Sequence, residues 1–91
     1  MKKIILDGTQ FTSKEKLHAI LKSELQLPDY YGNNLDALWD CLTCDIHLPM
    51  TIEWRNFECS KALLGDYAEK TLKIFLRTAD FLNDDFNIKV Y

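Results

Sequence analysis

Two aspartates one helical turn apart, Asp36 and Asp40, are the residues whose type and spacing point most directly to a functional site. Like charges four positions apart repel each other on a helix, and the helix dipole disfavours an anion towards the C-terminal end, where Asp40 falls. Between Lys22 and Arg55 the chain has no basic residue that could offset the two carboxylates. A stretch that departs from local preference in this way is a candidate functional site.

The aspartates belong to a longer segment, residues 27–43, that places aromatic and amide side chains near them. Pro28 and Gly32 predict a loop. The side chains of interest on this loop are Tyr30, Tyr31, Asn33 and Asn34. The asparagines are natural helix caps, and paired tyrosines leave apolar area uncovered unless something packs against them. We therefore predict a tyrosine-bearing loop that leads into a helix.

Apolar residues after Asn34 recur at i, i+3, i+4 and i+7, which predicts a helix with one buried stripe. The members of that stripe are Leu35, Leu38, Trp39 and Leu42. Asp36, Asp40 and Thr43 then lie together on the flank of the stripe. We expect Trp39 to face the core along its inner edge and to support the polar flank with its rim.

Length and composition restrict the class of protein. The 91 residues predict one domain over residues 1–91, and 47% hydrophobic residues indicate a globular chain. The formal charge of −3 argues against a nucleic-acid binder and suits a basic protein partner. No apolar run reaches the length of a membrane span, and no signal peptide is visible. We therefore expect a cytoplasmic protein that contacts neither membrane nor nucleic acid.

Alternating strand and helix patterns predict an α/β fold. Strands are expected at residues 2–6, 50–54 and 86–90, and helices at about 13–25, from 35, at 55–64 and at 67–82. The run Ile4-Ile5-Leu6 is typical of a buried strand, and Trp54 is predicted to lie in the core. Thr12 with Glu15, and Asp66 with Glu69, have capping-box spacing. The inward side of the last helix is predicted to be Ala68, Leu72, Phe75, Ala79 and Leu82. Helices between strands imply a three-stranded parallel sheet packed with about four helices.

Cysteine and histidine spacing leaves a second class of function open. Cys41, Cys44 and His47 form C-x-x-C-x-x-H, which could serve as a redox pair or hold a metal. Only three ligands are in view, so buried or incidental thiols are the simpler interpretation. The odd number of cysteines, with Cys59 as the third, argues against a disulfide framework. His18 falls one residue from the apolar stripe of its helix, which predicts a surface or boundary position.

The segments YYGNNLDALWDCLT and IEWRNFECSK resemble the barstar family of intracellular ribonuclease inhibitors. The similarity runs from Lys2 to about Lys61 and is weaker from Ala62 to Tyr91. This resemblance implies the barstar-like fold, no enzymatic activity, no cofactor or metal, and a chain that is monomeric when free. The implied partner is a basic ribonuclease, whose phosphate site a carboxylate would fill.

The resemblance also implies which residues bind. Asp40 and Thr43 would enter the phosphate site, and the remaining residues would dock around it. The complete implied set is Tyr30, Tyr31, Gly32, Asn34, Leu35, Asp36, Trp39, Asp40 and Thr43.

Three positions depart from the family pattern. Cys44 and Asp45 stand where the family has Gly and Trp, and an ungapped alignment puts Arg77 where the family contributes a glutamate to the ribonuclease. A cation in place of an anion costs affinity for a basic surface through repulsion. The departures therefore suggest a ribonuclease other than barnase, or a different basic protein. An interaction module whose partner is no nuclease remains an alternative.

Overall fold

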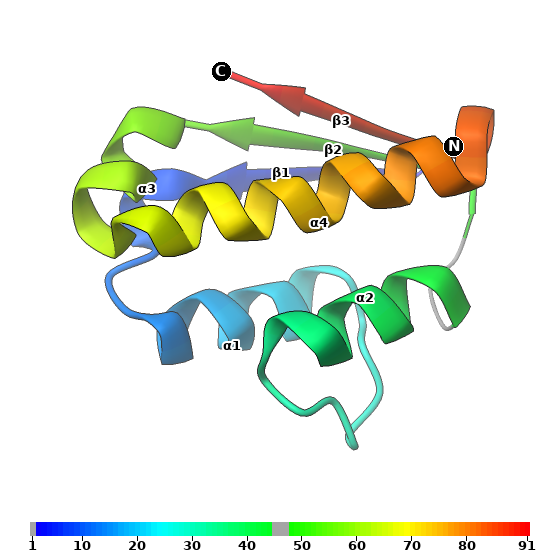
Figure 1. Ribbon diagram of the computed structural model, residues 1–91, viewed down its shortest axis with the longest axis horizontal. Helices are drawn as coiled ribbons and strands as arrows, with labels where there is room; N and C mark the ends of the chain where they lie inside the picture. Colours follow the sequence, from blue (N-terminus) through cyan, green and yellow to red (C-terminus); the bar gives the residue numbers. More distant parts are fainter. Residues whose placement is uncertain (1, 45–47) are drawn as a thin grey trace.

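Three parallel strands in the order β1-β2-β3 form the sheet, as the sequence predicts. The computed structural model in Figure 1 describes residues 2–44 and 48–91. The strands are β1 (Lys2–Asp7), β2 (Met50–Arg55) and β3 (Phe86–Val90), and the α-helices are α1 (Lys14–Glu24), α2 (Leu35–Cys44), α3 (Phe57–Leu64) and α4 (Asp66–Leu82). Short 3-10 turns, η1 (Gly8–Gln10) and η2 (Asn83–Asp85), follow β1 and α4. The predicted α/β fold, with three strands and four helices, is confirmed.

The helices pack against one face of the sheet, and the other face is open to solvent (Figure 1). Ile5 is 49% exposed on the open face, so the expectation that its apolar run is buried throughout was wrong. Glu53 lies opposite Ile5 in the strand register and is almost fully buried. Lys3 Nζ and Arg55 Nη2 lie 2.8 and 3.1 Å from its carboxylate oxygens. The hydrogen bond from Lys3 and, to a smaller extent, that from Arg55 lower the pKa of Glu53.

Trp54, predicted to be a core residue, is fully buried on the covered face of β2. The rings of Phe11, Phe57 and Phe75 pack edge-on against it, with centroid distances of 5.7, 4.9 and 6.1 Å. Such edge-to-face pairs add to the stabilisation from apolar burial. The indole therefore joins the segment after β1, α3 and α4 in one aromatic cluster.

Ser60 satisfies the polar atom of that indole. Its Oγ accepts a hydrogen bond from Trp54 Nε1 at 3.0 Å and donates one to the Gly8 carbonyl at 3.1 Å. A Cβ on Gly8 would collide with the Ser60 hydroxyl and come within 2.7 Å of the Arg55 carbonyl. Glycine is therefore required there by the close approach of three segments.

The starts of two helices differ from prediction. Ser13, rather than Thr12, caps α1 by accepting a hydrogen bond from Lys16 N at 3.0 Å. Gly65 precedes α4 with φ 62° and ψ −139°, and no side chain caps that helix, so the Asp66–Glu69 capping box was also wrong. Both predictions rested on spacing alone, which several residue pairs can satisfy.

The inward side of α4 largely follows prediction. Ala68 and Phe75 are buried, and the other predicted residues, Leu72, Ala79 and Leu82, are partly buried against the core. Thr71 and Thr78 are buried too, although polarity hid them from the pattern. Their hydroxyls donate to the carbonyls of Tyr67 and Ile74, both at 2.8 Å. Residues 45–47, between α2 and β2 in the sequence, fall outside the described part of the chain.

Replacing Ser60 by alanine should lower the free energy of unfolding by about 1–3 kcal/mol, because the buried indole N–H then loses its hydrogen-bond acceptor. Urea denaturation measures the change. The exposed neighbour Cys59, changed to alanine, is the control and should shift stability by less than about 0.5 kcal/mol. Equal effects from the two substitutions would contradict the role assigned to the Ser60 hydroxyl.

Candidate functional site

The loop before α2 is held by its own backbone and amide groups. Tyr31 N donates to the Pro28 carbonyl at 3.0 Å, which closes a turn, and Asn33 has a left-handed φ of 56°. Asn34 Oδ1 accepts a hydrogen bond from Ala37 N at 2.7 Å, and its Nδ2 donates to the Gly32 carbonyl at 3.2 Å. Of the two asparagines predicted as possible helix caps, Asn34 is therefore the one that caps α2.

Helix α2 separates its apolar and acidic residues as predicted. Leu38 and Leu42 are fully buried, whereas Leu35 and Trp39 are partly buried against the core. The carboxylates of Asp36 and Asp40 are exposed. Within the described ranges no lysine or arginine nitrogen lies within 4.0 Å of either carboxylate. Helix α2 therefore presents two anions, one turn apart, to solvent.

Thr43 lies one turn beyond Trp39 and next to the acidic pair. Its hydroxyl donates to the Trp39 carbonyl at 2.9 Å, with the Asp40 carbonyl at 3.2 Å. The hydrogen of this hydroxyl is therefore engaged within the helix in the free protein. The oxygen remains able to accept a hydrogen bond from a partner.

The two loop tyrosines point to different environments. Tyr30 is 73% exposed, whereas Tyr31 is 4% exposed and its hydroxyl lies 2.6 Å from His18 Nδ1. Tyr31, which the resemblance places in the binding set, therefore shows little of its ring to solvent in the free protein. That ring holds the loop from within, and Tyr30 is the aromatic side chain that the loop presents.

His18 is buried between two phenols, which corrects its predicted surface position. Its Nε2 lies 2.6 Å from the Tyr67 hydroxyl on α4, opposite the contact with Tyr31. A neutral imidazole has one donor and one acceptor nitrogen, so one phenol donates to the ring and the other accepts from it. Burial lowers the pKa of His18, partly opposed by the charge of Glu15, and burial also raises the pKa of Tyr31 and of Tyr67.

Beside the acidic residues, α2 meets the C-terminal half of α4 (Figure 1). The guanidinium carbon of Arg77 lies 4.5 Å from the centroid of the Trp39 ring. Phe81, one turn further along α4, lies 5.7 Å from the same ring and is 62% exposed. The sequence did not single out Phe81. Phe81 lies four residues after Arg77, so the sequence places the two side chains on the same side of α4. That both of them contact Trp39 follows only from the packing of α4 on α2.

The three cysteines form no disulfide framework and occupy different environments. Cys41 is buried, whereas Cys44 and Cys59 are exposed. Among the described residues, no group of three or more His, Cys, Asp or Glu side chains is arranged to hold a metal. His47, the third member of the suggested motif, lies outside the described residues. Of the two thiols in the suggested redox pair, Cys44 is therefore the one that solvent reaches.

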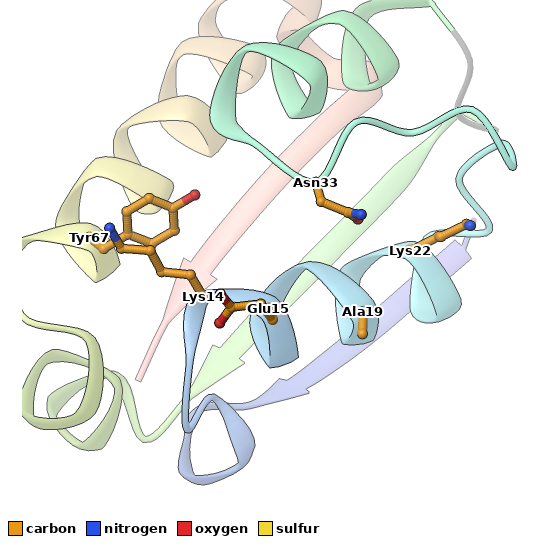
Figure 2. Close-up of a pocket in the computed structure, with 6 residues that line it drawn as sticks. All are labelled: Lys14, Glu15, Ala19, Lys22, Asn33 and Tyr67. Atoms are coloured by element: carbon orange, nitrogen blue, oxygen red, sulfur yellow. The ribbon is translucent and has the colours of Figure 1, made fainter.

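A cavity of about 430 Å³ opens beside the loop (Figure 2). It lies between α1, the loop and the start of α4, and its lining residues are Lys14, Glu15, Ala19, Lys22, Asn33 and Tyr67. Lys14 Nζ lies 4.7 Å from the centroid of the Tyr67 ring. Neither Asp36 nor Asp40 lines this cavity. Elsewhere too, none of the helices in the described ranges has the length and apolar character that a membrane crossing needs.

Comparison with known proteins is consistent with this geometry. The sequence model of the family described as "Barstar (barnase inhibitor)" matches residues 1–91. A protein of Bacillus subtilis (strain 168) named "Putative ribonuclease inhibitor YrdF" is 50% identical over 88 residues, covering 97% of each chain. Both matches include the loop, α2 and α4.

Folding stability should depend on His18 below neutral pH. In the unfolded chain its pKa is about 6.5, and burial lowers it in the folded protein. The unfolded state therefore binds the proton first as pH falls, so the contribution of His18 is complete above pH 6.5 and decreases below it. The slope can reach about 1.4 kcal/mol per pH unit.

Urea unfolding of the parent and of His18→Gln between pH 7.5 and 5.5 measures this dependence. Glutamine keeps a donor and an acceptor but does not titrate, so the variant should lose less stability over this range than the parent. The second histidine, His47, is present in both proteins and cancels in the difference. Parallel pH curves would show that the buried imidazole is not protonated on unfolding.

Proposed function

The chain belongs to the barstar family, and on that premise we propose that it inhibits a basic ribonuclease by covering the active site of the enzyme. The observation that carries the proposal is the exposed acidic pair on α2, Asp36 and Asp40, which has no cationic neighbour within the described residues. In the free protein this pair costs a little helix stability. A partner with converging Arg and Lys groups would relieve the repulsion between the two carboxylates and form ion pairs with them.

The mechanism follows from the chemistry of RNA cleavage. A ribonuclease holds the substrate phosphate with basic side chains, and a carboxylate placed there accepts the same charge-assisted hydrogen bonds. We assign this position to Asp40. The Thr43 oxygen lies on the same side of α2 and accepts a further hydrogen bond. RNA and inhibitor then compete for one site, and the inhibitor catalyses no reaction.

Groups around the acidic pair extend the contact. Tyr30 offers an exposed aromatic ring, which gives a large contact area at low entropic cost. Asn34 holds the loop through its hydrogen bonds to the Gly32 carbonyl and to Ala37 N, and Leu35 and Trp39 are sequence neighbours of the acidic pair. Tyr31 contributes through its buried hydrogen bond to His18 and not through direct contact.

The proposal is tested by asking what the immobilised chain retains from a lysate of its native host. The parent chain should retain a ribonuclease, identified by its RNA-cleaving activity after release, and Asp40→Ala should not. Barnase is assayed in parallel with both forms, because the family takes its description from that enzyme. Retention of proteins without any ribonuclease activity would instead favour an interaction module with a partner that is no nuclease.

Replacing Asp40 by alanine should weaken binding of the captured ribonuclease by about 3–5 kcal/mol, since the basic groups of the enzyme would be buried without an anion. The loss should appear mainly as faster dissociation. Thr43→Ala should cost about 1 kcal/mol, because it removes a neutral partner. Dissociation kinetics of the purified complexes measure both effects.

Thermal melting of the same variants separates binding from folding. Asp40→Ala should melt no lower than the parent, because the anion is unfavourable near the helix C-terminus. Asp66→Ala is the control. It also removes one negative charge, but at the N-terminal end of α4, and it should leave the dissociation rate unchanged. If Asp40→Ala inhibited the enzyme as well as the parent does, phosphate mimicry would not be the mechanism.

Association should slow as ionic strength rises. Exposed charges on α2 attract a basic enzyme over long range, and salt screens such attraction beyond roughly 8 Å at physiological strength. Stopped-flow association rates between low and high salt measure the effect, with Asp36→Asn as the comparison. That variant should show a smaller salt dependence, and an on-rate independent of salt would exclude electrostatic steering.

A further inference from the structure

The seam between α2 and α4 carries an exposed cluster of three side chains that the acidic pair does not explain. Trp39, Arg77 and Phe81 form this aromatic–cation cluster. The Arg77 guanidinium stacks on the indole at 4.5 Å, and the Phe81 ring lies 5.7 Å from it at an interplanar angle of 59°. Phe81 is 62% exposed, and Trp39 is only partly buried. The cluster therefore leaves a large apolar area and a cation uncovered next to the acidic residues.

Stacking prepares Arg77 for one kind of contact. A guanidinium directs its N–H donors outward in its own plane, so a face stacked on an indole still leaves the donor edges available. Within the described residues no carboxylate lies within 4.0 Å of Arg77. Because the stack also restricts the side chain before binding, less conformational entropy is lost when a carboxylate pairs with it.

The charges of the surface alternate over a short distance. Asp40 follows Trp39 directly in α2, and Arg77 covers the ring of that same tryptophan. A partner with a uniformly basic surface would gain at Asp40 and be repelled at Arg77. Tryptophan and arginine are also the residue types most enriched among the residues that dominate binding energy. The complementary surface is therefore basic in one place and acidic in the next.

We propose that the cluster of Trp39, Arg77 and Phe81 is a second anchor for the ribonuclease, which pairs a carboxylate of the enzyme with Arg77 and packs an adjacent apolar side chain on Phe81. This inference rests on the proposed function and adds to it the chemistry of the enzyme surface beside the active site. The anchor selects among ribonucleases. An enzyme with a basic residue opposite Arg77 is rejected, even where its phosphate site accepts Asp40.

The test uses the ribonuclease retained by the parent chain and not by Asp40→Ala. Dissociation constants are measured for Arg77→Leu, Arg77→Glu and Phe81→Ala. Arg77→Leu keeps an apolar cover on Trp39 and loses the donors, so binding should weaken about 10-fold, and charge reversal should weaken it about 100-fold or more. Phe81→Ala should weaken binding about 10-fold through lost apolar burial.

A matched control separates a local contact from a change in overall charge. Lys89→Glu makes the same charge reversal on the open face of the sheet, away from α4, and should leave the dissociation constant within about 2-fold of the parent. Urea denaturation of the Arg77 and Phe81 variants should show unchanged stability, because both side chains are exposed.

A charge exchange identifies the carboxylate. Surface Asp and Glu residues of the ribonuclease are changed to Lys one at a time, and one of these enzymes should bind Arg77→Glu more tightly than it binds the parent. If Arg77→Glu binds like the parent, if Lys89→Glu loses as much, or if no exchange restores binding, the anchor is absent. If Asp40→Ala abolishes inhibition and Arg77→Glu does not weaken binding, the proposed ribonuclease inhibition is supported and the second anchor is contradicted. When no ribonuclease is retained at all, both fall.

Discussion

A buried imidazole that must satisfy two phenols at once is the constraint on which the arrangement of the site depends. His18 on α1 lies 2.6 Å from the hydroxyls of both Tyr31 and Tyr67, so the loop, α1 and the start of α4 share one hydrogen-bonded group. Each of these polar atoms would be costly to bury without the others. Because Tyr31 is drawn inward, its neighbour Tyr30 is left on the surface. The loop before α2 is thus oriented by hydrogen bonds that lie inside the protein.

Local pattern was sufficient for the elements of the fold and for the acidic pair. The strand and helix periods predicted the parallel sheet, and the unfavourable spacing of Asp36 and Asp40 predicted an exposed anionic surface. Local pattern failed where a residue depends on a distant partner. His18 looked like a boundary residue because its hydrogen-bonding partner on α4, Tyr67, is 49 positions away in the chain. The pairing of Trp39 with Phe81 was hidden for the same reason.

Polar residues in buried positions were the second source of error. Glu53 alternates with apolar residues along β2, yet it is almost fully buried, because Lys3 and Arg55 cover it. Thr71 and Thr78 are buried because each hydroxyl donates to a carbonyl one turn earlier. Polarity alone predicts exposure only when no neighbour can satisfy the group, and such neighbours are set by packing.

The two outer strands of the open sheet bear on how the protein behaves at high concentration. The order β1-β2-β3 leaves β1 and β3 at the edges, where backbone groups could pair with another copy of the chain. These strands have only six and five residues, and they carry Lys2, Lys3 and Lys89. Bringing two such edges together would place like charges side by side, which opposes intermolecular strand pairing. The lysines thus act as gatekeepers against aggregation.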